Sequence, residues 1–133
     1  MNAPETAVAR FTLTAPVTVT APPLADGERW AGIVTTEKSL HHIILLPGDQ
    51  AGASWKKQMA WAKKAGGDLP DRVELATLRR TLPEEFKPDW YWSNEQHAAD
   101  SDYAWSQGFT YGIQTSIGIN DELRARSVRR VAI

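Results

Sequence analysis

The sequence predicts an α+β fold built on an antiparallel sheet. Two segments near the middle, residues 54–65 and 71–82, carry apolar side chains at the spacing of amphipathic helices. The segments before and after them alternate apolar and polar side chains, which is typical of half-buried strands. Strands, helices and strands follow one another without the repeated alternation of a parallel sheet. We therefore expect two helices packed on one antiparallel sheet.

The N-terminal part, residues 1–50, is rich in predicted strands. Residues 11–20 alternate without a break, and Pro16 among them indicates a sheet edge or a bulge, because proline cannot donate a ladder hydrogen bond. Residues 29–36 and 39–48 form a predicted hairpin around a polar turn.

Both predicted helices have recognisable ends. Ser54 is a suitable N-cap for the first, and Gly66 and Gly67 end it. Asp71, followed three residues later by Glu74, predicts a capping box for the second. We expect these helices to bury one stripe each, made of Trp55, Met59 and Ala62 and of Leu75, Leu78 and Leu82.

The C-terminal part returns to strand patterns. Residues 109–119 alternate strictly and are expected to form one strand. A last short strand is expected over residues 126–133, and it contains Val128 and Val131.

Three tryptophans are expected to anchor the core: Trp90, Trp92 and Trp105. By alternation, Trp90 and Trp92 share one face of a strand, which leaves Tyr91 at the rim.

The composition fits one domain over residues 1–133. The net charge of -1 argues against nucleic acid as a partner, because phosphate-binding domains are usually far more basic. The longest apolar run, residues 43–47, is much shorter than the roughly 20 residues of a membrane helix, and no secretory signal is visible. We therefore expect no membrane association and a location in a host cytoplasm or a virion.

The residues offer little for catalysis. The chain has no cysteine, which excludes disulfides, thiolate zinc sites and a cysteine nucleophile. Ser93, His97 and Asp100 or Asp102 have the residue types of a hydrolase triad, but no nucleophile-elbow motif accompanies them. We therefore expect no enzyme, and a hydrolase is the weaker alternative.

Metal ligands are also poorly arranged. His41 and His42 are adjacent in a predicted strand, so they point to opposite faces; we expect one to bond inside the sheet and the other to be solvated. The loop 97–102 has carboxylates at a calcium-loop spacing but lacks the remaining ligands and the glycine. We expect no metal and no cofactor, although calcium binding by this loop stays open.

Four arginines lie close to the C-terminal end: Arg124, Arg126, Arg129 and Arg130. Strand arginines often pair with acids of neighbouring loops, and residues 84–102 are rich in such acids. We expect structural ion pairs here in preference to a phosphate site.

Four short motifs follow one another in a characteristic order: GGDLPDRVEL at 66–75, WYWS at 90–93, YAWSQGFTYG at 103–112 and RSVRRV at 126–131. Their order and spacing resemble the Lcl C-terminal domain family, over a region that we place at residues 54–133. The resemblance implies a C-type-lectin-like fold, with a small twisted antiparallel sheet and two helices. It also implies a phage or prophage origin for a small protein of this kind.

The resemblance assigns fold roles to several residues. Leu69 is expected to be buried, Pro70 and Asp71 to open the second helix, and Arg72 and Glu74 to tie that turn to the rest of the fold. Trp92 and Trp105 are implied as core anchors, with Gly108 and Gly112 at tight backbone positions. The activity of the enzymatic relatives is not implied, because it needs cysteine or metal, and the Glu-Pro-Asn or Gln-Pro-Asp motifs of calcium-dependent lectins are missing.

The function predicted from these patterns is non-enzymatic recognition of a protein or a glycan. The expected ligand-binding residues are His97, Tyr111, Gln114, Ser116 and Asn120. Gln114, Ser116 and Asn120 lie on the polar face of the predicted strand, and His97 lies in the loop near its end. Tyr111 has the opposite parity, and a bulge at the neighbouring glycines would turn it outward.

Two alternatives to a surface-binding domain stay open. One is a phage inhibitor of a host intracellular factor. The other is a virion structural or assembly protein, a homo-oligomer in which the threonine-rich N-terminal strands pair between copies.

Overall fold

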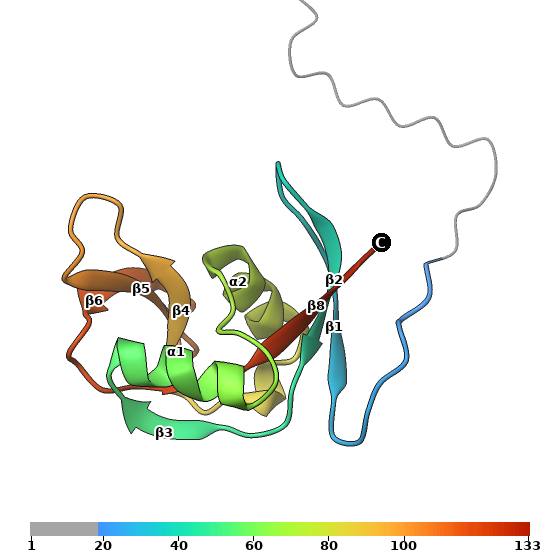
Figure 1. Ribbon diagram of the computed structural model, residues 1–133, viewed down its shortest axis with the longest axis horizontal. Coiled ribbons are helices and arrows are strands. Elements are labelled where there is room, and N and C mark those ends of the chain that lie inside the picture. Colours follow the sequence, from blue (N-terminus) through green and yellow to red (C-terminus); the bar gives the residue numbers. More distant parts are fainter. Residues whose placement is uncertain (1–18) are drawn as a thin grey trace, which may run out of the picture.

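The computed structural model describes residues 19–133, which form an α+β fold with two helices and two mostly antiparallel sheets (Figure 1). The smaller sheet contains, in spatial order, β1 (Arg29–Thr35), β2 (Leu40–Leu45) and β8 (Val128–Ala132). The larger sheet contains, in spatial order, β3 (Gln50–Ala53), β7 (Leu123–Ala125), β4 (Trp90–Gln96), β5 (Tyr103–Gly108) and β6 (Gln114–Gly118). The helices are α1 (Trp55–Lys64), α2 (Arg72–Thr81) and the short 3-10 helix η1 (Pro83–Glu85).

The predicted helices and the N-terminal hairpin are confirmed. Both helices begin and end within one residue of the expected bounds, and β1 and β2 pair antiparallel. The capping box of Asp71 and Glu74 is formed, whereas Ser54 occupies the N-cap of α1 without a side-chain bond. The strand predicted over residues 11–20 lies outside the described residues, apart from its last two positions.

The expectation of one antiparallel sheet is wrong. The strand with Val128 and Val131 pairs with β2 and belongs to the smaller sheet. In the larger sheet, β4 and β7 run parallel at the pair Tyr91 and Arg124. Alternation within a strand fixes which side chains share a face but does not fix which strand becomes the neighbour.

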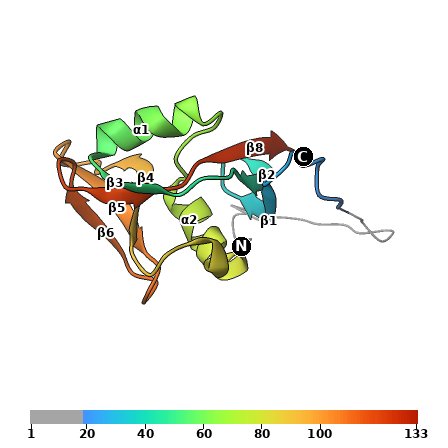
Figure 2. The same ribbon diagram turned by 90° about the horizontal axis from the view of Figure 1, so that it is seen from below.

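Strand β4 lies between two cores, because α1 and α2 lie on opposite sides of it (Figure 2). Tyr91 is fully buried on the α2 side with Leu75 and Leu78. Trp92 is fully buried on the α1 side with Trp55. The placement of Tyr91 at the rim is therefore wrong: both faces of the strand are covered, so parity does not separate buried from exposed residues.

The hydroxyl of Tyr91 is held inside its core. It donates to Asp49 Oδ2 at 2.6 Å and accepts from the backbone N–H of Lys87. Burial and the neighbouring carboxylate of Asp49 raise the pKa of this phenol to about 12. Arg124 donates to the other oxygen of Asp49, so both carboxylate oxygens of Asp49 accept a hydrogen bond.

The single strand predicted over residues 109–119 is interrupted by a turn. β5 ends at Gly108, β6 begins at Gln114, and the residues between them form the turn of a hairpin. Gly112 adopts a φ of 78°, which favours glycine, and its N–H donates to Gly108 O. Phe109 leaves the strand direction because its ring stacks on Phe86 at 4.1 Å between centroids.

A buried carboxylate joins α2 to the smaller sheet. Glu74 is fully buried, and Arg130 on β8 donates to both of its oxygens at 2.6 and 2.7 Å. His41 on β2 lies 2.8 Å from the same carboxylate. Burial raises the pKa of Glu74, but the hydrogen bonds from Arg130 and the backbone of Asp71 outweigh it, so the net pKa is lowered. Glu74 therefore stays ionised and holds these elements together.

The second histidine of the pair is also buried. His42 accepts a hydrogen bond from the indole N–H of Trp30 at 3.1 Å. The expectation that one histidine is solvated is therefore wrong. His41 meets Glu74 of α2 on one face, and on the other the ring of His42 lies beside that of Trp30 on β1, with 6.0 Å between the centroids.

The four C-terminal arginines form structural ion pairs, as predicted. They pair as follows: Arg124 with Asp49, Arg126 with Glu85, Arg129 with Glu28, and Arg130 with Glu74 and Asp68. Only Glu85 comes from the acidic region at 84–102 that was expected to supply the partners.

None of the helices within residues 19–133 is long and apolar enough to cross a membrane.

We predict that Arg130→Met lowers the free energy of unfolding by about 3 kcal/mol, because it leaves the Glu74 carboxylate buried without its strongest partner. Denaturant melts measure this loss. Arg29→Met is the matched control, since Arg29 pairs at the surface with side-chain exposure of 44%. The control should lose clearly less stability than Arg130→Met, and equal losses in the two variants would contradict the prediction.

We predict that Trp92→Ala lowers the free energy of unfolding by about 3–5 kcal/mol. The side chain is fully buried and its indole N–H donates to Ala53 O, so its removal opens a cavity and frees a polar group. Tyr111→Ala, at 84% exposure, should cost no more than about 0.5 kcal/mol in the same melts. A small loss at Trp92 would show that the α1 core repacks around the cavity.

Candidate functional site

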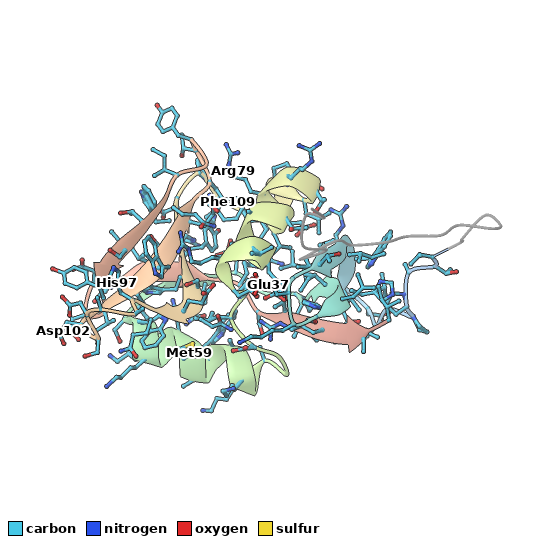
Figure 3. The ribbon with its side chains drawn as sticks, turned by 90° about the horizontal axis from the view of Figure 1, so that it is seen from above. Glu37, Met59, Arg79, His97, Asp102 and Phe109 are labelled. Carbon is cyan, nitrogen blue, oxygen red and sulfur yellow. The ribbon has the colours of Figure 1, made fainter. Side chains whose placement is uncertain are left out.

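The hairpin of β5 and β6 carries two of the five predicted ligand-binding residues, Gln114 and Ser116, on one face, and His97 joins them from the loop after β4. Gln114 pairs with Gln107, and Ser116 pairs with Trp105, so these four side chains lie on the α2 side of the sheet. His97 follows the end of β4 and reaches the same face through its contact with Trp105. Figure 3 shows His97 at the end of the hairpin opposite to Phe109.

A row of side chains connects Gln114 to His97. The amide oxygen of Gln114 accepts from Arg72 Nε at 3.1 Å. The guanidinium of Arg72 lies over the ring of Trp105, 3.7 Å from its centroid. The imidazole of His97 stacks against that ring at 5.4 Å, with 20° between the planes. The first turn of α2 therefore lies beside the sheet face and covers part of Trp105.

Trp105 is therefore not the core anchor that was expected. It is half-buried at the surface, whereas Trp92 is fully buried. Trp90 is half-buried too, with its ring against the backbone of Gly108. Trp92 and Trp105 lie on opposite faces of the sheet: Trp92 packs against α1, whereas Trp105 lies beside the first turn of α2, where Arg72 covers part of its ring.

Tyr111 and Asn120 lie apart from this row. Tyr111 is exposed to 84% in the hairpin turn, so its outward direction agrees with the expectation but arises from a turn and not from a strand bulge. Asn120 is exposed in the turn after β6. The five predicted residues therefore do not form one group.

An open groove of about 620 Å³ runs between α2 and the hairpin. Its lining residues are Arg72, Val73, Ala76, Glu95, Gln107, Gly112 and Gln114. A neighbouring depression of about 340 Å³ shares Val73 and Glu95 with it and extends to Lys38 in the turn between β1 and β2. The two together form a continuous surface, which we call the α2 groove.

The N-terminus of α2 beside this groove is already capped. Glu74 N–H donates to Asp71 Oδ1, and Arg72 N–H donates to Glu95 Oε2, each at 2.7 Å. The two carboxylates occupy the place where an anionic ligand would bind a helix N-terminus. The groove therefore offers mixed polar and apolar contacts and no anion cradle.

The residues considered for a hydrolase are engaged elsewhere. The hydroxyl of Ser93 is fully buried and bonds the backbone of Glu95. His97 Nδ1 accepts from the backbone N–H of Ala99, and Asp100 accepts from the N–H of Asp102. These contacts are local loop bonds, and the part of the chain that the structure describes brings no three metal-ligating side chains together.

Of the seven residues that line the larger depression, sequence reasoning predicted only Gln114 as ligand-binding and missed the other six: Arg72, Val73, Ala76, Glu95, Gln107 and Gly112. The resemblance gave Arg72 a fold role, and Val73 and Ala76 fall outside the leucine stripe of α2, which is the signal that could have identified an outward-facing apolar pair. No local pattern indicates Glu95.

A scan of protein-family models and a search of curated proteins find no match for this chain. The resemblance to the Lcl C-terminal domain family stays a prediction.

We predict that Gln114→Ala costs roughly 1–3 kcal/mol of unfolding free energy, more than an ordinary surface change. Its amide bonds Arg72 O, Arg72 Nε and the buried Gln107 Oε1, so the variant leaves these groups unpaired. Asn120→Ala, in an exposed turn, is the control and should cost no more than about 0.5 kcal/mol. Thermal and denaturant melts compare the two, and equal small losses would show that water replaces the Gln114 bonds.

Proposed function

We propose that this chain is a non-enzymatic recognition domain that binds a partner protein along the α2 groove. The observation that carries the proposal is the lining of the groove. The exposed side chain of Val73, at 49%, and that of Ala76 line the same groove as the charged groups of Arg72 and Glu95. Apolar contacts bordered by polar groups are the usual composition of a protein interface.

The edge of the larger sheet supports this proposal. β6 is its outermost strand, with β5 on one side and no strand of residues 19–133 on the other. An open strand edge offers backbone N–H and C=O groups to an extended segment of another chain. Because β6 also contributes Gln114 to the groove, a bound segment has both backbone and side-chain contacts within reach.

A protein partner is favoured over a glycan on this face. Sugar rings stack on open aromatic faces, whereas the ring of Trp105 is occupied by Arg72 at 3.7 Å and by His97 at 5.4 Å. These contacts fix Arg72 and His97 in place before a partner arrives. Groups that are already ordered reduce the entropy cost of association.

The lectin-like fold and the phage or prophage origin belong to this proposal as well. Several positions of the motifs behind the resemblance have fold roles: Leu69 is fully buried, Asp71 caps α2, and Gly112 has a positive φ. One fold can carry many unrelated functions, because the scaffold sets the structure and the surface site sets the function. A recognition role without catalysis fits that division.

Ala76→Arg tests the proposal by filling the groove with a long charged side chain. A photo-crosslinking residue at position 76 first identifies the partner covalently in a lysate of the source cells. With the purified partner, Ala76→Arg should raise the Kd at least tenfold, which is about 1.4 kcal/mol. Isothermal calorimetry measures the change.

Ala60→Arg is the matched control, because Ala60 is an exposed alanine on α1, outside the groove. It adds the same side chain and charge, and the Kd should stay unchanged. Equal melting temperatures show that both variants fold. If Ala76→Arg binds as tightly as the parent chain, the partner contacts another surface.

A further inference from the structure

A second, more enclosed cavity lies on the other side of the hairpin turn from the α2 groove. Its volume is about 220 Å³, and its lining residues are Asp89, Trp90, Gly108, Thr110, Tyr111 and Ile113. We call it the turn pocket. None of its residues lines the α2 groove, although Gly112 of the same turn does.

The turn pocket contains two large apolar side chains that folding leaves in water. Tyr111 is exposed to 84% and Ile113 to 55%. Exposed aromatic and aliphatic side chains that border one cavity are a mark of a binding site. Sites for drug-sized ligands usually measure roughly 300–1,000 Å³, so the turn pocket is suited to a single side chain.

The turn that presents Tyr111 is held from both ends. Phe109 stacks on Phe86 in the core, and Gly108 and Ile113 are joined by a backbone hydrogen bond. Arg79 on α2 donates to the backbone oxygens of Phe109 and Thr110 at 3.4 Å, and Figure 3 shows Arg79 beside Phe109. Tyr111 is therefore presented by an ordered turn, which lowers the cost of binding.

Gly108 allows the ring of Trp90 to line the turn pocket. The ring of Trp90 lies against Gly108, where an added Cβ would stand 3.0 Å from the ring carbons. This close approach keeps the indole beside the cavity. Trp90 and Tyr111 thus supply two aromatic rings to one small space.

A carboxylate completes the lining. Asp89 is exposed, and its Oδ1 accepts from the backbone N–H of Trp90 at 2.8 Å, which fixes its direction. Within residues 19–133, no lysine or arginine forms an ion pair with it. Among these residues its negative charge has no basic partner, and its position in the pocket lining suits it to meet a cation.

We propose that the turn pocket binds the side chain of a lysine or arginine from the partner protein. The aliphatic stem packs along Ile113 and Tyr111, and the cationic head group lies between the aromatic rings and the carboxylate of Asp89. Aromatic faces and a carboxylate attract the same cation by different means, so the two contributions add. This inference rests on the proposed function in one respect, namely that the occupant belongs to a partner protein.

The test uses free side-chain analogues and needs no partner. The N-acetyl methylamides of lysine, arginine and norleucine are titrated into the ¹⁵N-labelled chain, and the indole signal of Trp90 and the amide signal of Tyr111 are followed. The lysine and arginine analogues should shift both signals saturably, with millimolar affinity. The norleucine analogue, which keeps the stem without the charge, should bind at least fivefold more weakly.

Two charge-matched variants locate the effect. Asp89→Asn keeps an oxygen acceptor for the Trp90 N–H, and it should weaken binding of the lysine analogue roughly five- to tenfold. Asp121→Asn removes the same charge from an exposed turn at the other end of β6, and it should leave the affinity unchanged. Tyr111→Ala should abolish the shift at Trp90 without lowering the melting temperature.

Three outcomes overturn the inference. Equal binding of norleucine and lysine analogues means an apolar site without cation recognition. Absence of saturable shifts with every analogue means that the pocket takes no single side chain. Shifts with a neutral monosaccharide such as glucose, but not with lysine, mean a carbohydrate site. Ala76→Arg should leave this titration unchanged, so a failure here and a failure of the α2 groove are distinguishable.

Discussion

The buried carboxylate of Glu74 is the constraint on which the arrangement of the elements depends. It is the third residue of α2, and it bonds the N-cap at Asp71, Arg130 on β8 and His41 on β2. A buried carboxylate is stable in its ionised form only when it is paired and hydrogen-bonded. These contacts therefore fix the position of the start of α2 relative to the smaller sheet. That position also places Arg72 over Trp105, and with it one wall of the α2 groove. The fold and the candidate site share one electrostatic cause.

The length of α2 then decides where the surface opens. Its leucine stripe covers Tyr91 on β4, and its first turn reaches Gln107 on β5 through Gln114. Ten residues of helix extend about 15 Å, and the outer part of the hairpin lies beyond this cover. Trp105 lies at the boundary of the covered surface. Its ring is a partner for the guanidinium of Arg72 and not part of a core. The open face is thus a consequence of helix length and helix position together.

Local signals explain how much could be predicted from the sequence. The helices follow from caps and apolar stripes, which involve neighbours three or four residues apart, and the placement of Gln114 and Ser116 on one face follows from alternation. The partners of Arg130 and the parallel pairing at Tyr91 join residues more than 30 positions apart, so no local pattern contains them. Both faces of β4 are buried, so alternation along this strand does not distinguish buried from exposed side chains. For this reason the sequence wrongly placed Tyr91 at the rim.

The α2 groove and the turn pocket both include residues of the turn between β5 and β6. A turn between an edge strand and its neighbour would ordinarily be mobile, but Phe109 is fixed in the core and Arg79 holds the turn backbone. The cost of ordering is therefore met during folding and not during binding. The α2 groove begins on one side of this turn, at Gly112, and the turn pocket begins on the other, at Tyr111. On the proposed function, a partner segment that crosses the turn meets both surfaces without either having to move, and the affinities of the two sites are then expected to combine through one rigid connection.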